Sequence, residues 1–559
     1  MSTDHGGGER VAIVSATGEQ LALISLEARV EALEWSPDGH SLMVLGADLG
    51  ADVSGAEGGY ALHGAPSGPA WLPEVASSDA QNLWRRLYRW SDGQSTPTAL
   101  TSPPVNVWEA AWLGNEAFVI VASDHHSEGS WYGATLRVMD ATGTERSRYQ
   151  AADQIGSPAG SPDGNRWAAI EAFCSDRGIV CGSITVGTAE GGRALDVGVE
   201  VTDVRWRDDC TILFAGLRED QTVVGEIEVT SGEQREHWNS SELTISGWYP
   251  KAVPIPQGGA CAIIEGYSRA PAIARLANGE AEVLADLAPS PSPQIPGSMT
   301  YHRWRGRDGL EIAGWLVLPD SEARDLPLLV DIHGGPVWAH RNRYAAVLRA
   351  GSAMVACGYA LFLPNPRGSG GRGQTFARKV HRDMAGEDTH DYLTGIDSLV
   401  ARGIVDPARI AVTGTSYGGF MSAWLVTQSD RFAAAVPISP VANWYSQHFA
   451  TQIPAWDKAM LDGSPQQPGG QYFSRSPVFF AEGVKTPTLV LAGSRDKNTP
   501  TGQAVELYGA LLEAGVETAI AIYPQDGHSL RGYPAYLDSA ARIVDWCERH
   551  VRGGWPDNS

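Results

Sequence analysis

The first half of the chain is a succession of short apolar runs separated by turns rich in Gly, Pro, Asp and Ser, with almost no helical periodicity. Short apolar runs bounded by such turn residues are typical of β-strands. A weak repeat of strand, polar turn and apolar strand recurs among these runs. Its copies lie at residues 32–44, 112–120, 161–170, 204–213 and 255–264. The last four copies recur at a spacing close to the ~40–50 residues of one β-propeller blade.

This repeat predicts an N-terminal β-propeller at residues 10–287. One blade of four antiparallel strands cannot bury both of its faces, so the units must stack in a ring. Residues 11–25 are a candidate for a further blade, and the sequence leaves the blade count open. A Gly-, Ala- and Pro-rich insertion at about 48–80 is expected to be a loop, and residues 1–9 are expected to be disordered. One β-sandwich, or two, is the alternative architecture.

The pattern changes in the second half, residues 288–559, where strand-like runs alternate with helix-like segments. A Pro- and Ser-rich stretch at 288–298 is expected to be a linker. Residues 299–318 alternate like a hairpin, and from residue 326 onward the pattern predicts a doubly wound α/β domain with a mostly parallel sheet. The predicted helices are 344–357, 391–402, 503–512 and 536–551, and a predicted strand is 360–364.

A short motif, G-T-S-Y-G at residues 414–418, lies between a predicted strand and a predicted helix. In this context G-x-S-x-G places a serine, here Ser416, on a sharp turn at the end of a strand, where a substrate carbonyl can reach the hydroxyl. The glycines on either side let strand and helix approach closely. The motif alone is weak in a chain with 64 glycines, and an ordinary Gly-rich turn is the alternative.

A serine hydroxyl needs a base to act as a nucleophile, and the base needs an orienting acid. A strand-like run at 486–493 ends in a loop that contains Asp496, and a second run at 518–524 is followed by His528. Ser416, Asp496 and His528 therefore each follow a predicted parallel strand. Because the carboxyl ends of parallel strands meet at one edge of a sheet, we expect the three side chains to form a catalytic triad there.

An H-G-G-P sequence that begins at His333 follows another predicted buried strand, residues 328–332. Such a loop supplies a backbone N–H group to an oxyanion hole, and the residue after the nucleophile supplies a second. The expected second donor is the N–H group of Tyr417.

Composition narrows the range of partners. The formal net charge of −23 argues against binding to nucleic acid or to an anionic membrane, because both attract excess Lys and Arg. The N-terminus shows no secretory signal, and no apolar run approaches the ~18 residues needed to span a membrane. Of six cysteines only Cys174 and Cys181 are close in sequence, at a spacing that suits neither a metal site nor a redox pair. We expect reduced cysteines and a cytoplasmic protein, with a Cys174–Cys181 disulfide as the alternative.

The chain resembles the prolyl oligopeptidase family of serine peptidases, closest to its acylaminoacyl peptidase and dipeptidyl aminopeptidase branch. The residues that carry the resemblance are H-G-G-P at 333–336, N-P-R-G-S-G at 365–370, the motif at 414–420, Asp496 and His528. The resemblance covers nearly the whole chain and implies an N-terminal propeller and a C-terminal α/β-hydrolase domain. It also implies that Ser416 is the nucleophile, His528 the general base and then acid, and Asp496 the carboxylate that orients it. By the same resemblance, the oxyanion donors are the backbone N–H groups of Gly335 and Tyr417.

The resemblance further implies a pocket for the residue before the scissile bond, walled by Val441, Trp444 and the ring of Tyr417. A place in the hydrophobic core is the alternative for Trp444. Acylaminoacyl peptidases tend to carry an arginine two residues after the catalytic aspartate, where this chain has Asn498. This departure argues against specificity for acylated peptides and makes Asn498 a candidate substrate-binding residue.

The two-glutamate motif with which dipeptidyl peptidases hold a free amine is not evident in the sequence. Glu171, Asp176 and Arg177 in the predicted propeller are candidates for that role, because an acidic residue that faces the cleft would bind a substrate ammonium group. A position in a surface loop is the alternative for all three residues.

The expected function is that of a serine exopeptidase that hydrolyses short peptides or aminoacyl amides through an acyl-enzyme, with no metal or cofactor. The propeller would restrict access to short or unfolded substrates. A hydrolase or acyl transferase acting on a small-molecule amide or ester, such as an aminoacylated natural product, is the first alternative, and an inactive peptide-binding protein is the second. The sequence leaves open the preferred side chain, a free or blocked substrate N-terminus, and whether the protein forms a homo-oligomer.

Overall fold

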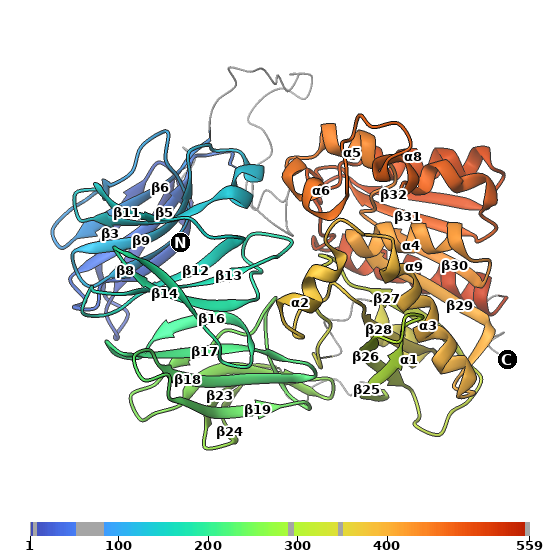
Figure 1. The fold of residues 1–559 in the computed structure, drawn as a ribbon, viewed down its shortest axis with the longest axis horizontal. Helices are drawn as coiled ribbons and strands as arrows, with labels where there is room; N and C mark the ends of the chain where they lie inside the picture. The colour runs from blue at the N-terminus through green and yellow to red at the C-terminus, as the bar shows by residue number, and fades with distance from the viewer. Residues whose placement is uncertain (1, 4–7, 52–82, 289–295, 345–349, 554–559) are drawn as a thin grey trace.

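In the computed structural model, the chain forms an all-β N-terminal half and an α/β C-terminal half that lie side by side (Figure 1). The structure describes residues 2–3, 8–51, 83–288, 296–344 and 350–553. The predicted disordered N-terminus (1–9), insertion loop (48–80) and linker (288–298) lie in large part outside the described residues.

Five antiparallel sheets of the N-terminal half are arranged as the blades of a propeller. Blade one has β4 (Arg29–Trp35), β5 (Ser41–Ala47), β6 (Arg85–Ser91) and β7 (Thr98–Ala99). Blade two has β8 (Asn106–Leu113), β9 (Ala117–Ser123), β10 (Thr135–Asp140) and β11 (Glu145–Tyr149), with the 3₁₀ helix η2 (Glu128–Gly133) after β9. Blade three has β12 (Gln154–Gly160), β13 (Trp167–Ala172), β14 (Ser183–Thr188) and β15 (Gly191–Leu195). Blade four has β16 (Glu200–Trp206), β17 (Thr211–Arg218), β18 (Gln221–Glu228) and β19 (Gln234–Ser240). Blade five has β20 (Thr244–Ile245), β21 (Val253–Pro254), β22 (Ala260–Gly266), β23 (Arg269–Ala277) and β24 (Glu280–Asp286).

The five repeat copies found in the sequence fall on these blades, which confirms the predicted propeller over a β-sandwich. The candidate for a further blade, residues 11–25, instead belongs to a three-stranded sheet of β1 (Ser2–Thr3), β2 (Glu9–Val14) and β3 (Gln20–Leu26). All six cysteines are free, so the Cys174–Cys181 disulfide does not form.

A repeated turn explains why the repeat is visible in the sequence. In blade one the Ser36 hydroxyl donates to the Asp38 carboxylate at 2.6 Å, and in blade three Ser161 donates to Asp163 at 2.6 Å. The glycine after each aspartate has a positive φ, 75° in blade one and 78° in blade three. Glycine adopts such a φ without strain, so Ser-Pro-Asp-Gly turns the chain from the first strand of a blade into the second.

The C-terminal half contains an eight-stranded sheet in the order β25-β26-β28-β27-β29-β30-β31-β32. Its first two pairings are antiparallel, and the pairings from β28 to β32 are parallel. The strands are β25 (Ser298–Arg305), β26 (Glu311–Leu318), β27 (Leu326–Ile332), β28 (Ala360–Asn365), β29 (Val405–Thr415), β30 (Phe432–Ile438), β31 (Thr488–Gly493) and β32 (Thr518–Tyr523). This mostly parallel sheet confirms the predicted α/β-hydrolase domain.

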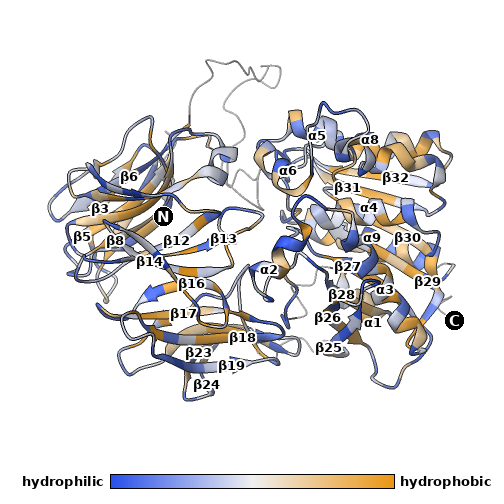
Figure 2. Cartoon of the chain, in the orientation of Figure 1, coloured by the Kyte–Doolittle hydropathy of each residue, from blue (hydrophilic) through white to orange (hydrophobic). Residues whose placement is uncertain are grey.

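Helices cover both faces of this sheet. Helices α3, α4 and α8 contribute to one hydrophobic core, and α1 and α9 to another core on the opposite face. The helices are α1 (Gly351–Ala356), α2 (Gln374–Ala377), α3 (Glu387–Ala401), α4 (Tyr417–Gln428), α5 (Trp444–Ala450), α6 (Pro454–Met460), α7 (Gln471–Ser474), α8 (Gly502–Glu513) and α9 (Ala535–Val551), with 3₁₀ helices η4 (Arg378–Val380) and η5 (Pro477–Gly483). Part of the predicted helix 344–357 lies outside the described residues. Figure 2 shows apolar residues along the strands of both halves. None of the described helices is both long and apolar enough to cross a membrane.

A buried carboxylate joins the two halves. Glu200, in the first strand of blade four, accepts hydrogen bonds from the backbone N–H groups of Gly371 (2.5 Å) and Gly373 (3.1 Å) and from Nε2 of Gln374 (2.7 Å). Gln374 also accepts a hydrogen bond from the backbone N–H of Phe173 in the propeller at 2.7 Å. These contacts place α2 between the halves, as Figure 1 shows, and the strand ends of the C-terminal sheet lie close to the propeller loops.

Candidate active site

Ser416 lies on a tight turn between β29 and α4. Its φ is +66° and its ψ −122°, a conformation that residues with side chains rarely adopt. A Cβ atom on either Gly414 or Gly418 would overlap the carbonyl oxygen of Ile332 in the neighbouring strand. The two glycines therefore let β27, β29 and α4 meet at the serine, and this close approach accounts for the G-x-S-x-G pattern.

Asp496 and His528 meet at the same edge of the sheet. Asp496 follows β31 and His528 follows β32, and Nδ1 of His528 lies 2.8 Å from Oδ2 of Asp496. The other carboxylate oxygen of Asp496 accepts the backbone N–H groups of Asn498 and Thr499, both at 2.9 Å. With Nδ1–H donating to Asp496, Nε2 of His528 is the nitrogen that remains to accept a proton.

The electrostatic surroundings of His528 suit a general base. Burial alone would lower its pKa, but the Asp496 carboxylate outweighs this effect by charge and hydrogen bonding, and Asp176 adds a smaller contribution of the same sign. The pKa of His528 is therefore raised above its ordinary value. A raised pKa means a stronger base, which favours removal of a proton from a nearby hydroxyl.

The H-G-G loop is held in one orientation by its histidine. Nδ1 of His333 lies 2.7 Å from the carbonyl oxygen of Gly334, and Nε2 lies 3.0 Å from the hydroxyl of Ser369. Burial lowers the pKa of His333 to about 4, so the ring is neutral near pH 7. The N–H and C=O groups of a trans peptide point in opposite directions, so the Gly335 N–H points away from His333.

The side chain of Tyr417 is buried beneath the turn and is not among the residues that line the cavity with Ser416. Its hydroxyl donates to Oδ2 of the buried Asp388 in α3 at 2.6 Å, and its ring is only 2% exposed. Burial raises the pKa of Asp388 to about 6, although the hydrogen bond from Tyr417 opposes that rise. This contact ties the residue that follows the nucleophile to the adjacent helix.

Ser416 and His528 line the same cavity of about 520 Å³ between the two halves. Both halves contribute to its wall, through propeller loops and through the segments that follow strands β27, β29 and β32. The lining residues are Asp176, Ile179, Gly247, Trp248, Asp331, Ile332, His333, Gly334, Gly335, Trp338, Arg343, Thr415, Ser416, His528, Ser529, Leu530, Arg531 and Tyr536.

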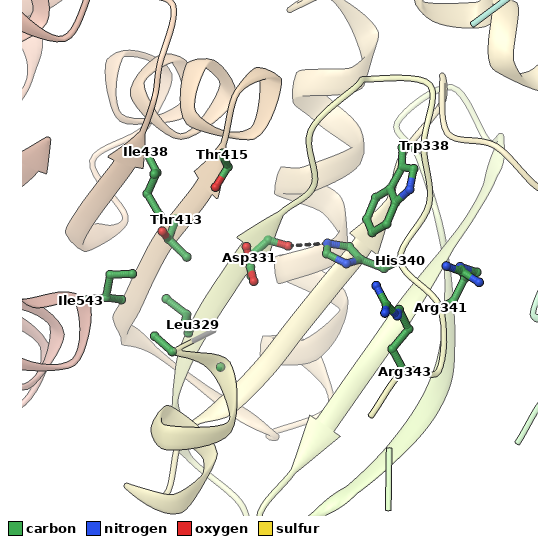
Figure 3. Close-up of a pocket in the computed structure, with 12 residues that line it drawn as sticks. Leu329, Asp331, Trp338, His340, Arg341, Arg343, Thr413, Thr415, Ile438 and Ile543 are labelled. Carbon is green, nitrogen blue, oxygen red and sulfur yellow. Dashed lines mark hydrogen bonds between the residues drawn. The ribbon is translucent and has the colours of Figure 1, made fainter. Parts of the chain in front are cut away.

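A smaller cavity of about 170 Å³ adjoins it and shares Asp331, Trp338, Arg343 and Thr415 with it. Figure 3 shows this cavity, where Nε2 of His340 lies 3.0 Å from the carbonyl oxygen of Asp331. The described residues that line it all belong to the C-terminal half.

Of the three propeller residues predicted to bind substrate, only Asp176 reaches the cavity with Ser416. Arg177 points into a separate cavity of about 830 Å³ along the first strands of blades one to four, where it pairs with Glu128 at 3.2 Å and covers the Trp108 ring. Glu171, in β13 of blade three, accepts hydrogen bonds from the hydroxyl of Tyr149 in blade two and from the backbone N–H of Ala152.

The predicted pocket wall lies in the hydrophobic core. Trp444 is fully buried, stacks on Trp456 and meets Phe420 edge to face. Val441 is buried in the same core and, like Trp444, is not among the residues that line the described cavity. Asn498 supports the loop that holds Asp496, since its side-chain oxygen accepts a hydrogen bond from Gln452 at 2.8 Å.

Sequence reasoning missed Trp248, Trp338, Arg531 and Tyr536, which all line the cavity. Arg531 follows His528 by three residues, and this short spacing is the one sequence signal that places it near the candidate catalytic histidine. The two tryptophans come from different halves, and no sequence pattern links them.

Comparison with known proteins agrees with this architecture. The chain is 36% identical over 264 residues to the uncharacterized peptidase YuxL of Bacillus subtilis, a match that covers 46% of this chain and 39% of the relative. The chain thus spans about two fifths of the length of the curated relatives it matches first.

Solved structures share the complete two-part fold. An acylaminoacyl peptidase from Pyrococcus horikoshii superposes with a TM-score of 0.77 at 21% identity, covering 99% of this chain and 86% of the other. A puromycin-hydrolysing peptidase from Mycobacterium tuberculosis superposes with a TM-score of 0.69 at 19% identity, covering 95% and 80%.

The C-terminal half also matches a family model. The matched residues, 348–554, include Ser416, Asp496 and His528 and extend over most of the eight-stranded sheet. Together with the shared fold, this match confirms the resemblance seen in the sequence. The model that matches these residues is that of the prolyl oligopeptidase family.

Proposed function

We propose that the protein is a serine peptidase that cleaves short peptides or aminoacyl amides through an acyl-enzyme formed on Ser416. The observation that carries the proposal is that a histidine paired with a buried aspartate, His528 with Asp496, shares a cavity with a serine on a strained turn. The match of residues 348–554 to the prolyl oligopeptidase family and the similarity to a protein named as a peptidase support the same reaction class.

In this mechanism the Ser416 hydroxyl attacks the scissile carbonyl carbon while Nε2 of His528 takes its proton. The negative charge that develops on the carbonyl oxygen is stabilised by the N–H groups of Gly335 and Tyr417, and one such donor typically contributes ~3 kcal/mol. His528 then gives the proton to the leaving amine as the C–N bond breaks. A water molecule, deprotonated by His528, hydrolyses the ester and regenerates the serine.

Asp176 supports a substrate with a free amino group. It is a propeller carboxylate in the same cavity as Ser416, and burial raises its pKa to about 6 while the charge of His528 opposes the rise. At neutral pH the ionised carboxylate would attract a substrate ammonium group close to the scissile bond. Acylaminoacyl peptidases tend to carry an arginine at the position of Asn498. Here Asn498, in the loop that holds Asp496, makes hydrogen bonds with Gln452 and Asp496, and it provides no guanidinium group for a substrate with a blocked N-terminus.

Hydrolysis of a matched chromogenic panel tests the proposal. The panel comprises free aminoacyl, free dipeptidyl and N-acetylated aminoacyl anilides, and the Ser416→Ala protein is the blank. We expect Ser416-dependent cleavage that is faster for free-amine substrates than for their acetylated counterparts. Cleavage no faster than with Ser416→Ala would refute the peptidase, and a preference for acetylated substrates would refute the role of Asp176.

A further inference from the structure

One wall of the active-site cavity can be followed from ring to ring. Arg531 lies three residues after His528, and its guanidinium carbon lies 5.2 Å from the centre of the Trp248 ring. Trp248 meets Trp338 edge to face at 6.1 Å, and Trp338 meets His333 at 5.7 Å. The wall therefore runs from the segment after His528, through Trp248 and Trp338, to His333 of the H-G-G loop.

This wall lies on the leaving-group side of the scissile bond. The histidine of a serine hydrolase must reach both the serine oxygen and the departing amine, so the departing group lies beside the histidine. Arg531, three residues after His528, and Trp248, whose ring the Arg531 guanidinium covers, both line this cavity. Tyr417, Val441 and Trp444, which were expected around the acyl group, do not line this described cavity.

The tryptophan pair is fixed by contacts between the two halves. Nε1 of Trp338 donates to the carbonyl oxygen of Trp248 at 3.0 Å, and Arg341 donates to the same oxygen at 3.1 Å. Arg341 also donates to the carbonyl oxygen of Gly247 at 2.7 Å. Because the propeller loop is held by these hydrogen bonds, the wall exists before a substrate binds, which reduces the entropy lost on binding.

The chemistry of the wall specifies what it would hold. Trp248 is 40% exposed and thus retains apolar surface open to the cavity, while Arg531 supplies a permanent positive charge beside it. An amino acid released from the carboxyl end of a short peptide combines an apolar side chain with a carboxylate. Aromatic rings pack against tryptophan, and guanidinium groups bind carboxylates with paired hydrogen bonds.

We propose that Trp248, Trp338 and Arg531 form a leaving-group subsite for a C-terminal residue that has a large apolar or aromatic side chain and a free carboxylate. The proposal rests on the proposed peptidase function and names the substrate class: dipeptides and other very short peptides. The cavity volume of about 520 Å³ accords with a ligand of this size, since small-molecule pockets fall roughly between 300 and 1,000 Å³.

The test compares Ala-Phe with Ala-Phe amide, which differ only in the terminal carboxylate. With the wild-type protein we expect kcat/KM to be at least about tenfold higher for Ala-Phe, which corresponds to one charge-assisted contact. In Arg531→Gln the ratio between the two substrates should fall close to one. Arg549→Gln, which removes an exposed arginine paired with Glu517 at the far end of α9, is the matched control and should keep the wild-type ratio.

A second variant tests the apolar part of the subsite. Trp248→Ala should lower kcat/KM for Ala-Phe at least about fivefold more than for Ala-Ala, because only the phenyl ring loses its partner. Equal losses for the two substrates would refute the contact between the leaving side chain and Trp248.

Binding separates failure of the subsite from failure of the chemistry. Calorimetry with the Ser416→Ala protein should show tighter binding of Ala-Phe than of Ala-Phe amide, and Arg531→Gln in that background should abolish the difference. Equal affinities, or an unchanged difference in the arginine variant, overturn the subsite even if anilides are cleaved. If anilides are not cleaved but Ala-Phe binds with this preference, the subsite holds and the proposed catalysis fails.

Discussion

The hydrogen bond from Tyr417 to Asp388 allows a quantitative prediction. Both side chains are buried, at 2% and 1% exposure, and the bond is 2.6 Å long. Tyr417→Phe removes the donor and leaves Oδ2 with the longer contact from the Ala385 N–H at 3.2 Å, while Oδ1 keeps the N–H of Thr389 at 3.0 Å. Losing a hydrogen bond to a charged group destabilises a protein by about 1.5–3 kcal/mol, and losing one between neutral groups by about 0.5–1.5 kcal/mol.

The size of the loss should depend on pH. Burial raises the pKa of Asp388 to about 6, so the folded protein holds this proton more tightly than the unfolded chain does. Stability from this group is therefore complete below the ordinary aspartate pKa and is lost as pH rises through about 6, by roughly 3 kcal/mol in total. Removing the Tyr417 hydroxyl raises the pKa of Asp388 further and enlarges that loss.

Denaturant unfolding of wild type and Tyr417→Phe at about pH 5 and about pH 8 measures the effect. We expect a loss of about 2–3 kcal/mol at the higher pH and about 1 kcal/mol at the lower. Tyr472→Phe is the control, because this buried hydroxyl has no hydrogen-bond partner among the described residues, and its effect should be small at both pH values. An equal loss at both pH values, or a larger loss at the lower one, would refute the reasoning.

Three further predictions concern the site itself. Asp496→Asn should lower kcat by about 10⁴ and move the acidic limb of the pH–rate profile to lower pH, because the carboxylate that raises the pKa of His528 is gone. In wild type the ratio of kcat/KM for free-amine anilides to kcat/KM for acetylated anilides should fall as pH drops through about 6, because Asp176 takes up a proton there. Asp176→Asn should give a low ratio that does not depend on pH. A wild-type ratio that does not change with pH would contradict the role of Asp176. Gly418→Ala should abolish activity and lower the melting temperature, because its methyl group overlaps the Ile332 carbonyl; a folded, active variant would contradict the proposed turn.

The parts of the site that sequence could predict are those encoded locally. Ser416, Asp496 and His528 each follow a strand of a parallel sheet, and the sheet brings such positions together whatever the remaining packing. The Ser-Pro-Asp-Gly turns likewise encode the blades through contacts within a few residues, such as Ser161 to Asp163. Fold class and the paired Asp496 and His528 therefore follow from the chain alone.

The rest of the site depends on contacts between distant segments. Trp338 and Trp248 meet because Arg341 and Trp338 bind the propeller loop, a contact between residues about ninety positions apart. The direction of an aromatic side chain after a strand is equally undetermined by sequence. For Trp444 the sequence left a pocket wall and a core position open, and the side chain packs against Trp456 in the core.

The interface through Glu200 has a consequence for protein engineering. One buried carboxylate accepts hydrogen bonds from three groups of the 371–374 segment, and the propeller also supplies Asp176 and Trp248 to the cavity. The C-terminal domain expressed alone would keep its turn and its Asp–His pair but would lack part of the substrate-facing wall. Conversely, a chimera that carries a foreign propeller with an equivalent glutamate would retain the catalytic residues and acquire a different range of peptide substrates. Exchange of the propeller by recombination can thus change which substrates bind without changing the residues that carry out the reaction.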